Sequence, residues 1–92
     1  MASLKTREII QNLSKKGFAI NESRDHIWLN YIAPDGKKTT IRTKISHGKD
    51  SIGDQLISAM AKQIKLKTKD FISFSRCDIS KDEYYLLVKT NL

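Results

Sequence analysis

Cysteine, proline and glycine are scarce in this chain of 92 residues, which has one cysteine, one proline and four glycines. A lone cysteine has no partner for a disulfide within the chain, and no cysteine-rich metal motif exists. Cys77 is therefore interpreted as a buried thiol rather than a reactive one. No linker or repeat divides the sequence, and its length suits one domain with one core.

Long apolar segments are also missing. No run approaches the ~20 residues that cross a bilayer. The stretch MASLKTREII carries charges without the apolar segment of a signal peptide. We therefore expect a cytoplasmic protein with no membrane partner. Hydrophobic residues make up 39% of the chain and charged residues 29%, which is typical of a globular protein.

Acidic residues are outnumbered by basic ones. Ten Asp and Glu face 17 Lys and Arg, and the net charge is +7. Such an excess favours a polyanionic partner, with nucleic acid first, an acidic protein second and an anionic membrane third. The alternative is a solvated basic surface without a specific partner.

The spacing of apolar residues predicts a helix followed by three strands. The helix is expected over residues 4–16 and ends before Gly17. Strands are expected over 18–21, 26–33 and 37–45, where apolar and polar residues alternate or β-branched residues gather.

Three further helices are expected in the second half of the chain. The first begins at Ser51, where Asp54 completes a capping box. Thr68 can cap a short helix around the FISFSRC stretch, which the pattern alone leaves ambiguous between helix and strand. Ser80 and Glu83 form a capping box that opens the last helix.

The predicted fold class is therefore α+β: an α-β-β-β-α arrangement of two layers, with a three-stranded antiparallel sheet and both main helices on one face. Residues 1–66 form this core, and residues 67–92 form a helical extension that packs on the same domain. Four apolar side chains of the extension are expected either to add to the core or to form a dimer contact: Phe71, Phe74, Tyr84 and Leu87.

The clearest turn is Pro34-Asp35-Gly36, read as a three-residue hairpin loop with glycine in the left-handed position of a bulge. This loop pairs Ala33 with Lys37 and Leu29 with Ile41, which keeps apolar residues on one face.

The other face of the hairpin then carries His26 opposite Lys44 and Trp28 opposite Arg42. An indole beside cations suits a surface that binds a polyanion and stacks a base. The alternative is that the C-terminal segment covers half of Trp28. His26 taken alone is interpreted as a polar residue on the solvated face.

The order of these elements resembles the HicA toxins, small ribonucleases that cleave messenger RNA on a fold of the double-stranded-RNA-binding type. Three stretches within residues 4–66 carry the resemblance: KTREIIQNLSKKGF, RDHIWLNYIAPDGKKTTI and ISHGKDSIGDQLISAMAKQIKL. The resemblance implies that His26, at the start of the second strand, is the catalytic histidine. This chain has Arg24 and Asp25 where the family commonly has a small Gly-Ser pair; Asp25 is a candidate to hold the imidazole and Arg24 to bind phosphate.

The chemistry implied by this resemblance needs no metal and no cofactor, because RNA supplies its own nucleophile, the 2′-hydroxyl. An imidazole with a pKa near 6.5 can act as acid or base, and Arg42 and Lys44 would clamp the phosphate. His47 is a second candidate acid or base, or simply a loop residue. The predicted RNA-binding residues are Arg24, Trp28, Lys37, Lys38, Arg42, Lys44, His47 and Lys49.

Three functions remain open at this point. The first is an endoribonuclease toxin that acts on single-stranded mRNA and is neutralised by a HicB-like antitoxin protein. The second is a noncatalytic RNA-binding domain that uses the same basic sheet face. The third is an adaptor that uses the basic surface to bind protein.

Overall fold

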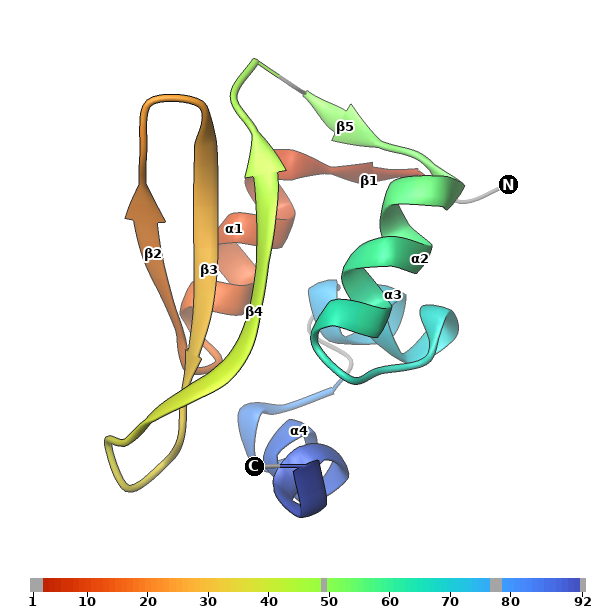
Figure 1. Cartoon of the computed structure of the whole chain (residues 1–92). Coiled ribbons are helices and arrows are strands. Elements are labelled where there is room, and N and C mark those ends of the chain that lie inside the picture. The colour runs from red at the N-terminus through yellow and green to blue at the C-terminus, as the bar shows by residue number, and fades with distance from the viewer. Residues whose placement is uncertain (1–2, 49, 77–78, 92) are drawn as a thin grey trace.

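The computed structural model describes residues 3–48, 50–76 and 79–91, and Figure 1 shows their arrangement. Its elements in chain order are β1 (Leu4–Lys5), α1 (Thr6–Ser14), β2 (Phe18–Glu22), β3 (His26–Ile32), β4 (Lys38–Ser46), β5 (Ser51–Ile52), α2 (Asp54–Gln63), α3 (Thr68–Ser75), α4 (Lys81–Val88) and a 3-10 turn (Lys89–Asn91).

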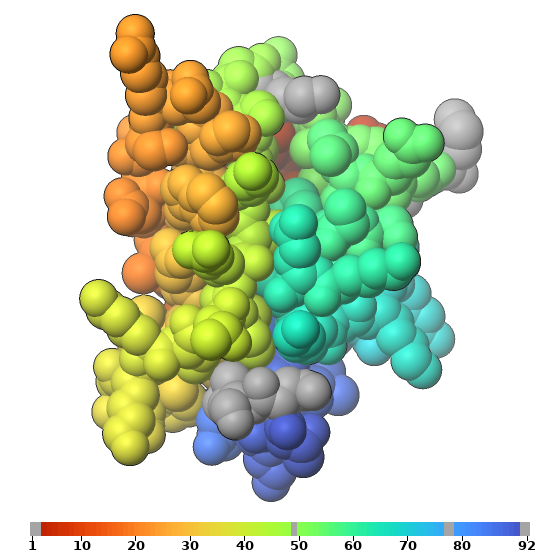
Figure 2. Space-filling view, in the orientation of Figure 1, coloured from red at the N-terminus to blue at the C-terminus, as the bar shows by residue number. Residues whose placement is uncertain are grey.

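The predicted α+β class is confirmed. Strands β2, β3 and β4 form an antiparallel sheet in that order, and the helices pack against it. Helix α1 lies behind the sheet and α2 runs beside β4 (Figure 1). On the opposite side the strands stay uncovered by helices in the space-filling view (Figure 2). We call this uncovered side the outer face.

A second, two-stranded sheet was not predicted. Strand β1 pairs with β5 in antiparallel fashion, with Leu4 opposite Ile52, and both of these side chains are buried. The predicted helix start at Ser51 is therefore wrong, because Ser51 lies in β5 and α2 begins at Asp54 without a side-chain cap. Pairing with β1 therefore determines the structure at Ser51, and the capping box predicted between Ser51 and Asp54 does not form.

The hairpin turn forms as predicted, but the register beyond it differs. Near the turn the Ala33 N–H donates to the Lys37 carbonyl, and Gly36 has a positive φ. A bulge follows, across which β4 advances by two more residues than β3. There the Thr39 hydroxyl donates to the Tyr31 carbonyl at 2.8 Å and accepts from the Ile41 N–H at 3.1 Å.

The bulge corrects three predicted pairs. Leu29 lies opposite Thr43 and not Ile41, Trp28 lies opposite Lys44 and not Arg42, and His26 lies opposite Ser46 and not Lys44. Because the shift is of two residues, every side chain keeps its predicted face of the sheet.

The C-terminal helices add to the core. Phe71, Phe74 and Tyr84 are fully buried, and Phe74 stacks on Tyr84 with ring centroids 4.6 Å apart. Leu87 does not add to the core: its side chain is half exposed, whereas that of Val88 is buried. The buried residues of α4 are Tyr84 and Val88.

A buried lysine connects α1 to this extension. The Nζ of Lys16 donates to the carbonyl of Phe74 at 2.5 Å and to that of Ile79 at 2.6 Å. Phe74 lies in the last turn of α3, where carbonyls have no partner within the helix. The side chain of Lys16 thus contacts the end of α3, 58 residues further along the chain, while its backbone N–H donates to the Leu13 carbonyl at the end of α1.

Two further predictions concern the thiol of Cys77 and the membrane. Cys77, interpreted as a buried thiol, lies outside the described residues. Among the residues that are described, none belongs to a helix long and apolar enough to cross a membrane.

Candidate nucleic-acid interface

Trp28 lies on the outer face close to two cations of the neighbouring strand. The guanidinium carbon of Arg42 is 5.0 Å from the indole centroid, and Nζ of Lys44 is 5.3 Å from it. Trp28 comes from the middle of β3, and the two cations come from alternate positions of β4. Trp28 is half-buried and both cations are exposed, so an aromatic face and two positive charges are presented to solvent together.

His26 lies next to Trp28 along the same strand. Their ring centroids are 6.4 Å apart, and the His26 side chain is half-buried rather than sealed in the core. The backbone of His26 is held by Ser23, whose N–H and hydroxyl both donate to its carbonyl. Among the described residues, none hydrogen-bonds the imidazole, so the expected support from Asp25 is not present.

Two hollows flank this group of side chains along β4. The larger, of about 370 Å³, is lined by Trp28, Thr40, Arg42, Thr43, Lys44 and Gln63. The smaller, of about 140 Å³, is lined by His26, Lys44, Ile45, Ser46, Ile52, Leu56, Ala59, Met60 and Gln63. Lys44 and Gln63 line both hollows. The Lys44 side chain therefore borders the hollow of His26 as well as the hollow of Trp28.

His47 lies near the end of the sheet where His26 begins β3, and its side chain makes a structural contact. Its Nε2 is 2.8 Å from the carbonyl of Ser23, in the turn between β2 and β3. Because a carbonyl only accepts, Nε2 must carry the proton of this bond. His47 therefore ties the end of β4 to the turn that also holds the exposed Arg24 and Asp25, just before His26.

Lys37 and Lys38 are not part of this group. They lie at the opposite end of β3 from His26, and seven strand residues span roughly 20 Å. There they line another hollow together with Tyr85 and Lys89 of the C-terminal segment. The predicted contact at Lys49 falls outside the described residues.

Sequence reasoning missed Gln63, the last residue of α2. Its Oε1 accepts the hydroxyl proton of buried Thr43 at 2.5 Å, which places an exposed amide beside the Trp28 hollow. The residue pattern contains no signal for this contact, because Gln63 is a polar residue on the solvent side of an amphipathic helix. Only the packing of α2 against β4 brings it to the site.

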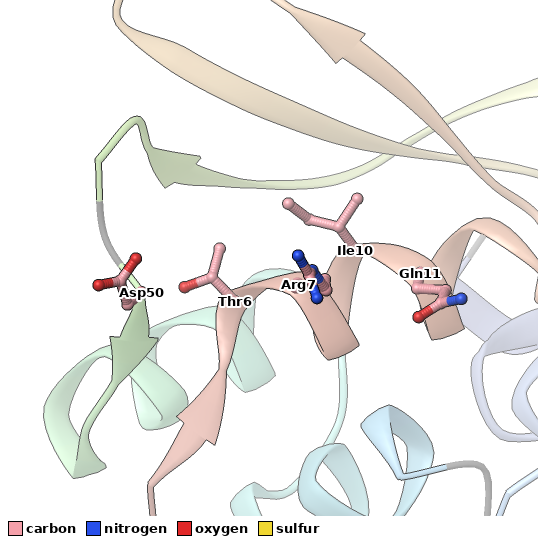
Figure 3. Close-up of a pocket in the computed structure, with 5 residues that line it drawn as sticks. All are labelled: Thr6, Arg7, Ile10, Gln11 and Asp50. Carbon is pink, nitrogen blue, oxygen red and sulfur yellow. The ribbon is translucent and has the colours of Figure 1, made fainter.

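A hollow larger than these two lies elsewhere, around the start of α1. Its volume is about 510 Å³, and Thr6, Arg7, Ile10, Gln11 and Asp50 line it (Figure 3). The buried hydroxyl of Thr6 has no hydrogen-bond partner among the described residues. This hollow combines one cation with one carboxylate, so it is a poorer match for a polyanion than the outer face.

No group of three or more His, Cys, Asp or Glu side chains that would suit a metal ion occurs in the described part of the chain. No protein-family model, no curated protein and no solved structure matches the chain. Fold and site together define a small α+β protein whose three-stranded sheet carries a basic, aromatic outer face.

Proposed function

We propose that this protein binds single-stranded RNA on its outer face and cleaves it with His26, as a metal-independent endoribonuclease. The observation that carries the proposal is that Arg42 and Lys44 both approach the Trp28 indole, with the His26 imidazole beside it. Aromatic rings that stack bases, next to cations that hold phosphates, are typical of surfaces that bind single strands.

The cleavage step uses few groups. His26 takes the proton from a ribose 2′-hydroxyl, and the 2′-oxygen bonds to the adjacent phosphorus. The bond from phosphorus to the 5′-oxygen breaks, that oxygen takes a proton from water, and the hydroxide left behind takes the proton held by His26. Lys44 lines the same hollow as His26 and supports the proposal, because it can offset the charge that builds on the phosphate.

This mechanism predicts three results for an experiment with single-stranded RNA. Cleavage must persist in a metal chelator, its products must end in a 2′,3′-cyclic phosphate, and DNA of the same sequence must stay intact. Replacement of His26 by alanine should slow cleavage roughly 10²–10⁴-fold, the usual contribution of a general base, while RNA binding changes little. Cleavage by His26→Ala at the wild-type rate would refute the role of His26.

A noncatalytic RNA-binding domain is the second candidate. It is favoured by one observation: no described residue hydrogen-bonds the imidazole of His26, whereas catalytic histidines are commonly oriented by a partner. Binding of RNA without cleavage, unchanged in the His26→Ala protein, would establish this alternative.

A protein antitoxin is part of the first proposal. The net charge of +7 and the exposed Arg42 and Lys44 support a partner whose acidic surface covers the outer face. The test is whether such a partner inhibits RNA cleavage, and whether exchange of both cations for glutamine weakens its binding as well as that of RNA.

A further inference from the structure

The hollow between Trp28 and Gln63 has features of a site for a single base. Its walls are the indole on one strand, two threonines and two cations of β4, and the amide at the end of α2. A volume of about 370 Å³ lies within the range of small-molecule sites. The aromatic wall offers a stacking surface to any base, whereas the amide offers a directional group.

The amide of Gln63 is oriented by the protein itself. Its Oε1 accepts the hydroxyl of Thr43 at 2.5 Å, and Thr43 is buried opposite Leu29 on β4. With the oxygen engaged, the amide presents its NH₂ group, which has two donors and no acceptor. The exposed end of Gln63 is thus a hydrogen-bond donor at the rim of the hollow.

We propose that this hollow is a base subsite in which Gln63 selects keto bases over amino bases. The inference rests on the proposed function, because it supposes that RNA lies on the outer face. Uracil and guanine carry a carbonyl oxygen at the position where cytosine and adenine carry an amino group. The NH₂ of Gln63 can donate to that oxygen, and it meets a second donor when the base is cytosine or adenine.

The experiment compares oligo(U) with oligo(C), both with 2′-fluoro sugars that lack the attacking hydroxyl. The wild-type protein should bind oligo(U) about two- to tenfold more tightly, which is the contribution of one hydrogen bond between neutral groups. Exchange of Gln63 for glutamate keeps the acceptor for Thr43 but replaces the outward donor by an acceptor. The ratio of the two affinities should therefore fall to one or invert in favour of oligo(C).

The matched control is Gln55→Glu, at an exposed position on the same helix. It adds the same negative charge and should weaken both oligonucleotides equally, leaving their ratio at the wild-type value. Thr43→Val offers a second variant without any change in charge. It releases the oxygen of Gln63, so the amide can turn either edge outward and the ratio should approach one.

Two outcomes distinguish a failure of the base subsite from a failure of the proposed RNA-binding function. If the protein binds both oligonucleotides through Trp28 with equal affinity, or if Gln63→Glu keeps the wild-type ratio, the base subsite is wrong and the RNA-binding function stands. If the wild-type protein binds neither oligonucleotide, the proposed function itself fails, and the subsite fails with it.

Discussion

Trp28 and Lys44 lie directly opposite each other on β3 and β4, and the lysine ammonium is 5.3 Å from the centroid of the indole. Arg42 approaches the same ring to 5.0 Å. Each cation–π contact at an exposed site contributes about 0.5–1 kcal/mol, so the two cations are held beside the ring before any ligand arrives. A base that stacks on Trp28 finds charge already in place for its neighbouring phosphates.

The first prediction concerns Trp28, which is the single tryptophan of the chain. All intrinsic tryptophan fluorescence therefore reports on the outer face, and we expect single-stranded RNA to quench it. Trp28→Ala should weaken binding by about 1–3 kcal/mol, the contribution of one stacked base, whereas Trp28→Phe should lose less because a ring remains. Binding by the alanine variant at wild-type affinity would remove the stacking role.

The second prediction concerns the salt dependence of RNA binding. Each phosphate contact on a single strand contributes about 0.7 to the slope of log K against log salt concentration. Arg42→Gln and Lys44→Gln should each reduce the magnitude of this slope by about that amount, as measured by titrations at several salt concentrations.

Arg7→Gln provides the control for this measurement. Arg7 is an exposed arginine on α1, a helix that lies behind the sheet and away from the outer face (Figure 1). The substitution removes the same charge and should leave the slope nearly unchanged. Equal slopes for Arg7→Gln and Arg42→Gln would show that RNA is bound by diffuse charge and not by the outer face.

The third prediction concerns the stability of the fold. Lys16→Met keeps most of the apolar stem but leaves the carbonyls of Phe74 and Ile79 without the ammonium donor. Loss of these charge-assisted bonds should lower the free energy of unfolding by about 2–3 kcal/mol. The neighbouring Lys15 is exposed, and Lys15→Met should change it by less than about 0.5 kcal/mol. Urea unfolding of the two variants measures the difference, and equal stabilities would contradict the role of Lys16.

The fourth prediction concerns stability at high pH. Burial raises the pKa of Tyr84, and the nearby Tyr31 raises it further. The Tyr84 hydroxyl donates to the carbonyl of Ile64 at 2.8 Å, so the folded protein keeps a proton that the unfolded chain releases near pH 10. The contribution of Tyr84 to the free energy of unfolding is therefore fully present below about pH 10. As the pH rises above 10, the free energy of unfolding falls by up to about 1.4 kcal/mol per pH unit because of this group.

Unfolding by urea at several pH values above 9 provides the measurement. Tyr84→Phe cannot ionise at this position, so its stability should decline less steeply than that of the wild type. At neutral pH the same variant should be about 0.5–1.5 kcal/mol less stable, because the hydrogen bond to Ile64 is lost. A decline as steep as in the wild type would show that Tyr84 does not control the alkaline transition.

The three strands of the main sheet, their two faces and the helices were predictable from local pattern, whereas β1 and β5 were not. Alternation of apolar residues placed Leu29 inside and Trp28 outside, and the Ser80–Glu83 capping box forms as predicted. Such features depend on residues close in sequence, whose spacing follows the period of a helix or a strand. The turn at Gly36 was also predictable, because the left-handed backbone that this turn requires depends only on residues close in sequence.

The precise neighbours across the sheet were decided by tertiary structure. The bulge depends on the hydroxyl of Thr39 reaching the Tyr31 carbonyl, a contact that pattern alone does not reveal, and it moves Lys44 to the position opposite Trp28. The amide of Gln63 reaches the site only because α2 packs beside β4, and Lys16 finds its partners 58 and 63 residues away. Side-chain alternation is a property of one strand, whereas these contacts join segments that only the folded chain brings together.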